Sequence, residues 1–209
     1  MMTKRNKLSL ITSFLDERYP NVGCELKYRK DYELVIAVML SAQTTDIAVN
    51  KVTENLFKTY PTFEALANAD LSVVEDIIHS IGLYKNKAKH VIEIARYILD
   101  SFNGVLPSDK ELLQNMPGVG NKTAGVIRAE VFKIPDLPVD THILRITKRL
   151  RLAAPEDDAY DTEMKLKKLF PKEDWIKLHH QLIHFGRDIC VARNPHCENC
   201  KLGEICTKK

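Results

Sequence analysis

Four of the five cysteines lie within the last twenty residues of the chain, with the spacing C-x6-C-x2-C-x5-C. Thiolate sulfur is a soft ligand, so four thiolates suit either a zinc ion or an iron–sulfur cluster. Structural zinc sites usually bring their ligands in two close pairs, and here one such pair is present. The spacing therefore favours a [4Fe–4S] cluster over zinc, and over disulfides or free thiols. The predicted ligands are Cys190, Cys197, Cys200 and Cys206, whereas Cys24 lies far from them and is predicted to be a buried apolar residue.

A second pattern that could bind a ligand is the string P-G-V-G-N-K-T-A at residues 117–124, which lies between two helical patterns. Pro117 is expected to end the first helix, and Gly118 and Gly120 allow a positive φ or a close backbone approach. The N–H groups of such a hairpin, together with a helix that begins near Asn121, form a positive concavity that suits a phosphate oxygen. One residue separates the glycines, so this is not a Walker loop and ATP binding is disfavoured.

Two residues beside this hairpin could carry catalysis. Lys122 is either a surface lysine attracted to phosphate or a nucleophilic amine. An amine can attack a sugar C1′ and form a Schiff base if desolvation or nearby positive charge lowers its pKa. Asp140 precedes a helical run and suits a helix N-cap. It could also stabilise a cationic sugar and help to deprotonate the attacking amine.

A basic segment follows Asp140 and contains no acidic residue before Glu156. Three of its side chains share a helix face at the spacing of one turn. A solvated face is the commonest meaning of such a run, but a nearby phosphate-binding hairpin makes a stripe that faces DNA more probable. The residues concerned are His142, Arg145, Lys148 and Arg149.

The elements that must position these residues are predicted to be helices. Apolar residues recur at helical spacing through most of the chain, and the almost wholly apolar run Leu34–Leu40 suits a buried helix. Turn signals break the helical patterns at short intervals, which predicts about ten short helices. Strand signals are scarce, because the apolar stretch Val131–Val139 contains Pro135 and Pro138. The sequence therefore predicts an all-α protein.

Composition sets wider bounds on the protein. The chain has 209 residues, 44% of them hydrophobic, which allows one large domain or two small lobes and excludes disorder as the main state. The net charge of +3 permits a polyanionic partner without requiring one. No apolar run is long enough to cross a bilayer, and the basic N-terminus lacks the apolar core of a signal peptide. We therefore expect a cytoplasmic protein with reduced cysteines.

Taken together, these motifs resemble those of the endonuclease III family of helix–hairpin–helix DNA glycosylases. The resemblance extends over nearly the whole chain, and the motifs follow the order of the family. It rests on L-S-A-Q-T-T-D at 40–46, I-G-L-Y-K-N-K-A at 81–88, the hairpin at 117–124, V-D-T-H at 139–142 and the four C-terminal cysteines.

The resemblance implies a two-lobed all-α fold. Residues 23–134 would form a six-helix lobe that carries Lys122, and residues 1–22 with 135–209 would form a lobe that carries Asp140 and the cluster. DNA would bind in the groove between the lobes, with the protein as a nucleoid-associated monomer.

The family removes oxidised pyrimidines from duplex DNA by everting the damaged nucleotide, then nicks the strand by β-elimination through a lysine Schiff base. The resemblance makes Lys122 and Asp140 catalytic and the cluster structural, and Gln43 and Leu83 would fill the vacated stack. Without it, these two would be an ordinary loop glutamine and a core leucine. The predicted DNA contacts are Gln43, Leu83, Gly118, Val119, Gly120, Thr123, His142, Arg145, Lys148 and Arg149.

Other readings remain open at the level of sequence. The adenine-removing branch of the same superfamily has a glutamate where this chain has Ala37 and lacks a lysine at position 122. The thymine-mismatch branch also departs from this chain at Lys122. Helix–hairpin–helix elements further occur in non-enzymatic DNA-binding modules, and four cysteines occur in zinc-bound interaction proteins. Lys122 together with Asp140 favours the enzyme.

Overall fold

The computed structural model describes residues 3–208, so Met1, Met2 and Lys209 of the expected second lobe lie outside it. This part of the chain contains eleven α-helices, three short 3-10 helices and no strand, which confirms the prediction of an all-α protein. The chain forms two compact units, residues 25–134 and residues 1–24 with 135–209, called here the central unit and the terminal unit. The first boundary was expected two residues earlier, between residues 22 and 23, and the second, between residues 134 and 135, is where it was expected.

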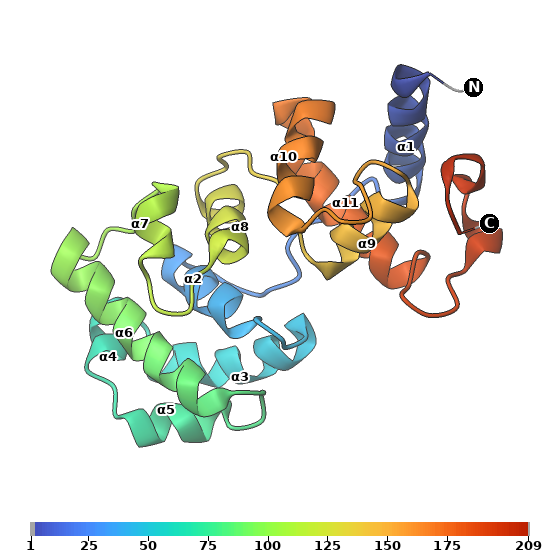
Figure 1. Cartoon of the computed structure of the whole chain (residues 1–209). Coiled ribbons are helices and arrows are strands. Elements are labelled where there is room, and N and C mark those ends of the chain that lie inside the picture. The colour runs from blue at the N-terminus through green and yellow to red at the C-terminus, as the bar shows by residue number, and fades with distance from the viewer. Residues whose placement is uncertain (1–2, 209) are drawn as a thin grey trace. The chain divides into compact units, whose positions relative to one another are not determined.

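The central unit contains seven helices where six were expected, and two of the seven are only five residues long. Helix α6 packs against α4 and α5, and α2 packs against α8 (Figure 1). The helices are α2 (Asp31–Leu40), α3 (Asp46–Thr59), α4 (Phe63–Ala67), α5 (Leu71–Ile78), α6 (Tyr84–Phe102), α7 (Lys110–Gln114) and α8 (Asn121–Val131).

Helix α2 lies in the interior of the central unit over residues Leu34–Leu40, as this apolar run predicts. Leu34, Val35, Ile36, Ala37 and Leu40 have no exposed surface. A helix that is apolar on every face can only be stable when neighbouring helices cover all of it. The segment that follows α2 is therefore anchored to a fixed core.

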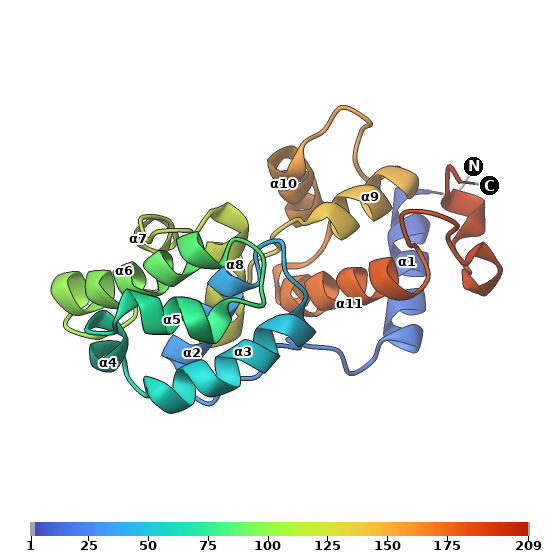
Figure 2. The same ribbon diagram turned by 90° about the horizontal axis from the view of Figure 1, so that it is seen from below.

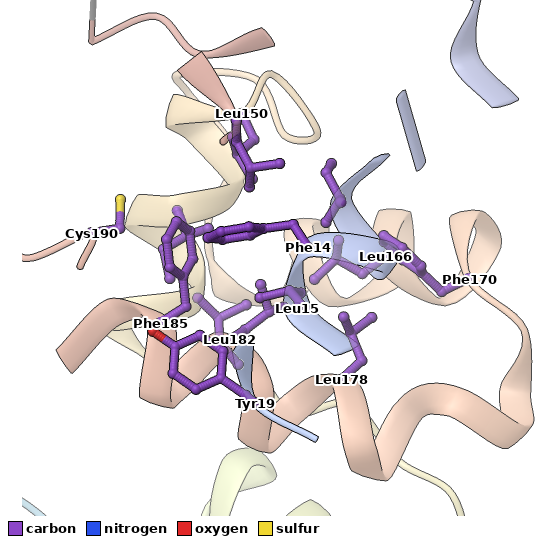
Figure 3. Packing of buried hydrophobic residues seen from close by; sticks show 14 of the residues in the cluster. Phe14, Leu15, Tyr19, Leu150, Leu166, Phe170, Leu178, Leu182, Phe185 and Cys190 are labelled. Atoms are coloured by element: carbon purple, nitrogen blue, oxygen red, sulfur yellow. The ribbon is translucent and has the colours of Figure 1, made fainter. Parts of the chain in front are cut away.

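The terminal unit is built around four α-helices, with short 3-10 helices in its connections. Their bounds are α1 (Lys4–Arg18), α9 (Thr141–Arg149), α10 (Ala159–Leu169), α11 (Trp175–Asp188), η1 (Lys172–Asp174), η2 (Cys197–Asn199) and η3 (Gly203–Ile205). Figure 3 shows the core that these helices share, in which the rings of Phe14 from α1 and Phe185 from α11 meet edge to face at 5.5 Å. Cys190 lies at the edge of this core, directly after α11.

Two general expectations from the sequence can be compared with the fold. Cys24 is half-buried, so the prediction of a fully buried residue was wrong. Among the described helices, none is both long enough and apolar enough to cross a membrane.

Candidate functional site

The hairpin between α7 and α8 depends on one glycine for both its shape and its packing. Gly118 has a φ of +74°, a conformation that residues with a side chain rarely adopt. A Cβ atom at this position would stand 2.6 Å from Nδ1 of His90 on α6. Gly120 has a φ of −92° and open space around it. The positive φ that the sequence allowed at both glycines is therefore found at Gly118 and not at Gly120, where a close approach to phosphate stays a prediction.

The N-terminus of α8 is left without a side-chain cap. Gly120 is the N-cap residue, and its carbonyl accepts the N–H of Ala124 at 2.9 Å, which closes the first turn. The N–H groups of a first helical turn have no partner within the helix and suit an anion. Val119 is buried, so a contact with DNA at this residue would go through its backbone, whereas Thr123 is partly exposed.

Lys122 is the second residue of α8 and its side chain is exposed. Within the described part of the chain, its ammonium forms no hydrogen bond or ion pair. The shielding from water expected for a nucleophilic amine is therefore absent in the free protein. A bound nucleotide would have to provide it.

Asp140 is the N-cap of α9, as its place in the sequence predicted. Its Oδ1 accepts the backbone N–H of Ile143 at 2.8 Å, and the residue is half-buried. The second carboxylate oxygen has no hydrogen-bond partner among the described residues. One oxygen of Asp140 thus fixes the side chain, and the other remains available to a substrate.

Sequence reasoning missed the residue that anchors the segment before Asp140. Nδ1 of His179, on α11, donates to the carbonyl of Pro138 at 2.9 Å, and both residues are buried. In the sequence, His179 is one of two adjacent histidines in a helical pattern. Nothing in that pattern distinguishes a structural donor from a surface histidine.

The two arginines of α9 bind the backbone at the C-terminal end of α11. Arg145 donates from Nε to the carbonyl of Cys190 at 3.1 Å and from Nη2 to that of Gly186 at 2.9 Å. Arg149 donates from Nη1 to the carbonyl of Val191 at 2.8 Å and from Nη2 to that of Ala192 at 3.0 Å. The sequence suggested that both side chains face phosphates. In the structure they hold the start of the cysteine loop, and their contact with DNA stays a prediction.

Helices α9 and α11 can form these bonds because they cross closely. A Cβ atom on Gly186 would stand 2.8 Å from Cβ of His142, so a larger residue would push the helices apart. His142 lies at this crossing and is half-buried, with its Nδ1 3.2 Å from Nη2 of Arg145. Burial lowers the pKa of the Arg145 guanidinium.

Lys148 points to a different surface of the terminal unit. Its Nζ donates to the carbonyl of Pro155 at 2.7 Å, and the residue lines a cavity of about 920 Å³. No acidic residue is among those that line it, and although Lys165 at its wall is paired with Asp157 at 2.6 Å, the cavity keeps a net positive charge. The other basic residues at its wall are Lys4, Lys7, Arg151, Lys165 and Lys168.

The four C-terminal cysteines lie near one another. Burial raises the pKa of the Cys200 thiol, and negative charge on Cys190, Cys206 and Cys197 raises it further. Two N–H donors point at sulfur: Nη1 of Arg149 lies 3.2 Å from Sγ of Cys190, and the backbone N of Lys208 lies 3.4 Å from Sγ of Cys206. Hydrogen bonds to cysteine sulfur are a means of stabilising iron–sulfur ligands.

These features fit a group held by four thiolates, since a bound cation would stabilise the deprotonated form of all four cysteines. Across residues 3–208, no three Cys, His, Asp or Glu side chains have the arrangement of a site for a metal ion.

Gln43 and Leu83 share an unusual backbone conformation. Their φ values are 55° and 59°, in the left-handed region that costs a residue with a side chain free energy. Both side chains are exposed, Leu83 to 61%, so Leu83 is not a core leucine. In Figures 1 and 2 the loop between α2 and α3, which carries Gln43, lies beside the turn that leads into α6, which carries Leu83. A hydrogen bond between Lys87 and Thr44 joins the two segments.

Comparison with known proteins agrees with these features. Residues 36–172 match the family model described as "HhH-GPD superfamily base excision DNA repair protein". Endonuclease III of Bacillus subtilis (strain 168) is 41% identical over 192 residues, which are 92% of this chain and 88% of that protein.

Two solved structures are similar over almost their whole length. One is a non-covalent Endonuclease III–DNA complex, with a TM-score of 0.94, 40% identity, and coverage of 99% of this chain and 96% of that one. The other is a trapped covalent Endonuclease III–DNA intermediate, with the same TM-score and identity and coverage of 99% and 97%.

Proposed function

Because this chain belongs to the HhH-GPD superfamily of base excision DNA repair proteins, we propose a role for each residue of its candidate site. The protein is a DNA glycosylase with abasic-site lyase activity, as the likeness to Endonuclease III over the full chain establishes. Its substrate class is duplex DNA that contains an oxidised pyrimidine or an abasic site, bound by a monomer. Lys122 acts as the nucleophile and Asp140 as the carboxylate that assists it.

The observation that carries this assignment is the state of Lys122. It is an exposed amine with no partner, one residue from the uncapped N-terminus of α8. The hairpin and this N-terminus offer N–H groups to a backbone phosphate, which positions a sugar without reading sequence. An amine held at that place can reach a deoxyribose carbon.

The reaction then proceeds in two stages. The uncharged amine of Lys122 attacks C1′ as the C1′–base bond breaks, and the base leaves as an anion that takes a proton from water. Asp140 stabilises the cationic sugar and accepts a proton from the new C1′-bound ammonium. The C1′–O4′ bond then breaks, O4′ takes this proton, and the nitrogen lone pair forms the iminium. The resulting iminium makes the C2′ proton acidic, so its loss expels the 3′ phosphate. Water then hydrolyses the iminium and frees Lys122.

A [4Fe–4S] cluster would be held by Cys190, Cys197, Cys200 and Cys206, and the N–H donors at two of these sulfurs fit such a group. When bound, the cluster supplies cross-links that order the loop, and it takes no part in the reaction. Arg145 and Arg149 fix the start of that loop to α9. A zinc protein would be colourless, whereas an iron–sulfur protein is brown.

Trapping with borohydride tests the nucleophile. Reduction of the iminium makes a stable adduct, so the wild-type protein is expected to cross-link to duplex DNA that contains thymine glycol or an abasic site. Lys122→Ala is expected to abolish the adduct. Lys89→Ala changes an exposed lysine on α6 and is expected to leave the yield unchanged. An adduct that persists at the wild-type rate in Lys122→Ala would assign the chemistry to another amine.

A further inference from the structure

Lys87 is a buried lysine without a negatively charged partner. It is the fourth residue of α6 and only 4% of its surface is exposed. Its Nζ donates to Oγ1 of Thr44 at 2.7 Å, and among the described residues no carboxylate forms an ion pair with it. Burial lowers the pKa of this ammonium.

This placement is energetically unfavourable for packing alone. An amine removed from water without a counterion costs free energy, and the N-terminal turn of a helix repels positive charge. A methionine would fill the same space without that cost. Lys85 and Lys89, close by on α6, have exposed side chains. The amine of Lys87 must therefore be explained by the polar contact that it makes.

That contact connects the two strained turns. Thr44 directly follows Gln43, and its backbone N–H donates to the carbonyl of Ser41 at 3.0 Å, which closes the turn around Gln43. At the other end, the backbone N–H of Lys87 donates to the carbonyl of Leu83 at 3.0 Å. One residue thus binds Leu83 through its backbone and the Gln43 turn through its side chain.

We propose that Lys87 is a positioning residue that holds the turns of Gln43 and Leu83 in one arrangement, so that both side chains enter the DNA stack together. This rests on the proposed function and on the role that the family resemblance implies for these two residues, which is to fill the space left by an everted nucleotide. Left-handed conformations of residues with side chains persist only where their surroundings fix them. The Lys87–Thr44 bond fixes the two turns to each other, although the two bonded residues are 43 positions apart in the sequence.

The test measures stack filling without chemistry. The probe is a duplex with a tetrahydrofuran abasic analogue, which cannot form a Schiff base, opposite 2-aminopurine. Insertion of protein side chains unstacks 2-aminopurine and raises its fluorescence. Lys87→Met is expected to reduce that rise about tenfold, because a small displacement of positioned groups has large effects. Affinity measured by anisotropy is expected to stay within about twofold, since phosphate contacts dominate it.

Two further variants separate positioning from general damage. Thr44→Val removes the hydroxyl at constant size, and with it the bond to Lys87 and a longer bond of 3.4 Å to the carbonyl of Ala42. It is expected to reduce the rise in the same direction, and the loss in the double variant is expected to be smaller than the sum of the two single losses, because both variants remove the Lys87–Thr44 bond. Lys89→Met changes an exposed lysine two residues along α6 and is expected to behave as wild type. Thr44→Val also keeps the test decisive if Lys87→Met does not fold.

A wild-type fluorescence rise in both Lys87→Met and Thr44→Val would overturn the proposal. So would an equal loss of fluorescence rise and affinity, because this would indicate general damage to the fold. The probe does not depend on Lys122. Failure of the catalytic assignment would appear in the trapping assay and leave this result standing.

Discussion

At the scale of single residues, a side chain of the site can form one hydrogen bond that fixes its position and still have a second polar atom available to a substrate. Asp140 shows this most clearly, with Oδ1 on the N–H of Ile143 and its second oxygen without a partner. Lys122 is the complementary case, an exposed amine that no structural contact occupies. A carboxylate that is already fixed by a cap can meet a cationic sugar with little loss of side-chain entropy.

Substitution of Asp140 separates these two roles. Asn also caps helices well, so Asp140→Asn is expected to change the free energy of unfolding by no more than about 0.5 kcal/mol. The negative charge is lost, and single-turnover base excision is expected to slow roughly a hundredfold or more. Asp158→Asn, at the N-cap of α10, is the matched control and is expected to leave excision unchanged. Normal excision by Asp140→Asn would leave Asp140 with a capping role alone.

At the scale of elements, tight crossings place the functional loops. The α7–α8 hairpin rests on α6 through Gly118, and α11 crosses α9 through Gly186. Because each glycine has no Cβ atom, its backbone can lie closer to a histidine of the neighbouring helix than the backbone of any other residue could. The positions of Lys122 and Asp140 within their own units thus depend on contacts made several residues away.

The two hairpin glycines are predicted to respond differently to the same substitution. Gly118→Ala combines a left-handed φ with a collision against His90 and is expected to destabilise the protein by about 1–3 kcal/mol. Gly120→Ala has an ordinary φ and open space, so thermal unfolding is expected to match wild type. Equal melting temperatures for the two variants would contradict this account of the hairpin.

The cysteine loop is predicted to depend on Arg149. Arg149→Met removes the bonds to Cys190, Val191 and Ala192. Because partners of metal ligands stabilise the bound metal, we expect the visible absorbance of the holoprotein to be lost about tenfold faster in the presence of a chelator. Arg193→Met removes the same charge from an exposed residue of the same loop and is expected to have no effect. If both variants lose their visible absorbance at the same rate, Arg149 does not stabilise the cluster.

At the scale of the whole molecule, the net charge is small, but basic side chains are concentrated at particular places on the surface. The net charge is only +3, but six basic residues line one cavity of the terminal unit, and Lys148 is among them. The commonest source of affinity for DNA is release of counterions from phosphates, which depends on local contacts. Lys148 is the one predicted DNA contact that lines this cavity, so its role can be tested against that of the other basic residues there.

Salt dependence can decide the role of Lys148. Duplex affinity is expected to fall linearly with salt on logarithmic axes. If Lys148 binds a phosphate, Lys148→Ala reduces that slope by about one. Lys168→Ala, at the wall of the same cavity but outside the predicted DNA contacts, is expected to keep the wild-type slope. An unchanged slope for Lys148→Ala would exclude this residue from the interface.

The sequence by itself determined features that depend on a few neighbouring residues. The hairpin glycine at 118 and the cap at Asp140 were predicted correctly, because turns and caps are set within a short stretch of chain. The buried helix α2 was also predicted, since an apolar run has no alternative to burial.

Only the tertiary structure decided which polar groups meet across long stretches of chain. Arg145 and Arg149 read as a phosphate stripe in sequence, yet their guanidinium groups bind carbonyls about 40 residues away. Without the family resemblance Leu83 would be an ordinary core leucine, but its side chain is exposed. Lys87, one of several lysines in its segment, is buried against Thr44. The physical reason is that a helical pattern fixes which face a side chain is on, whereas the packing of distant helices decides what that face meets.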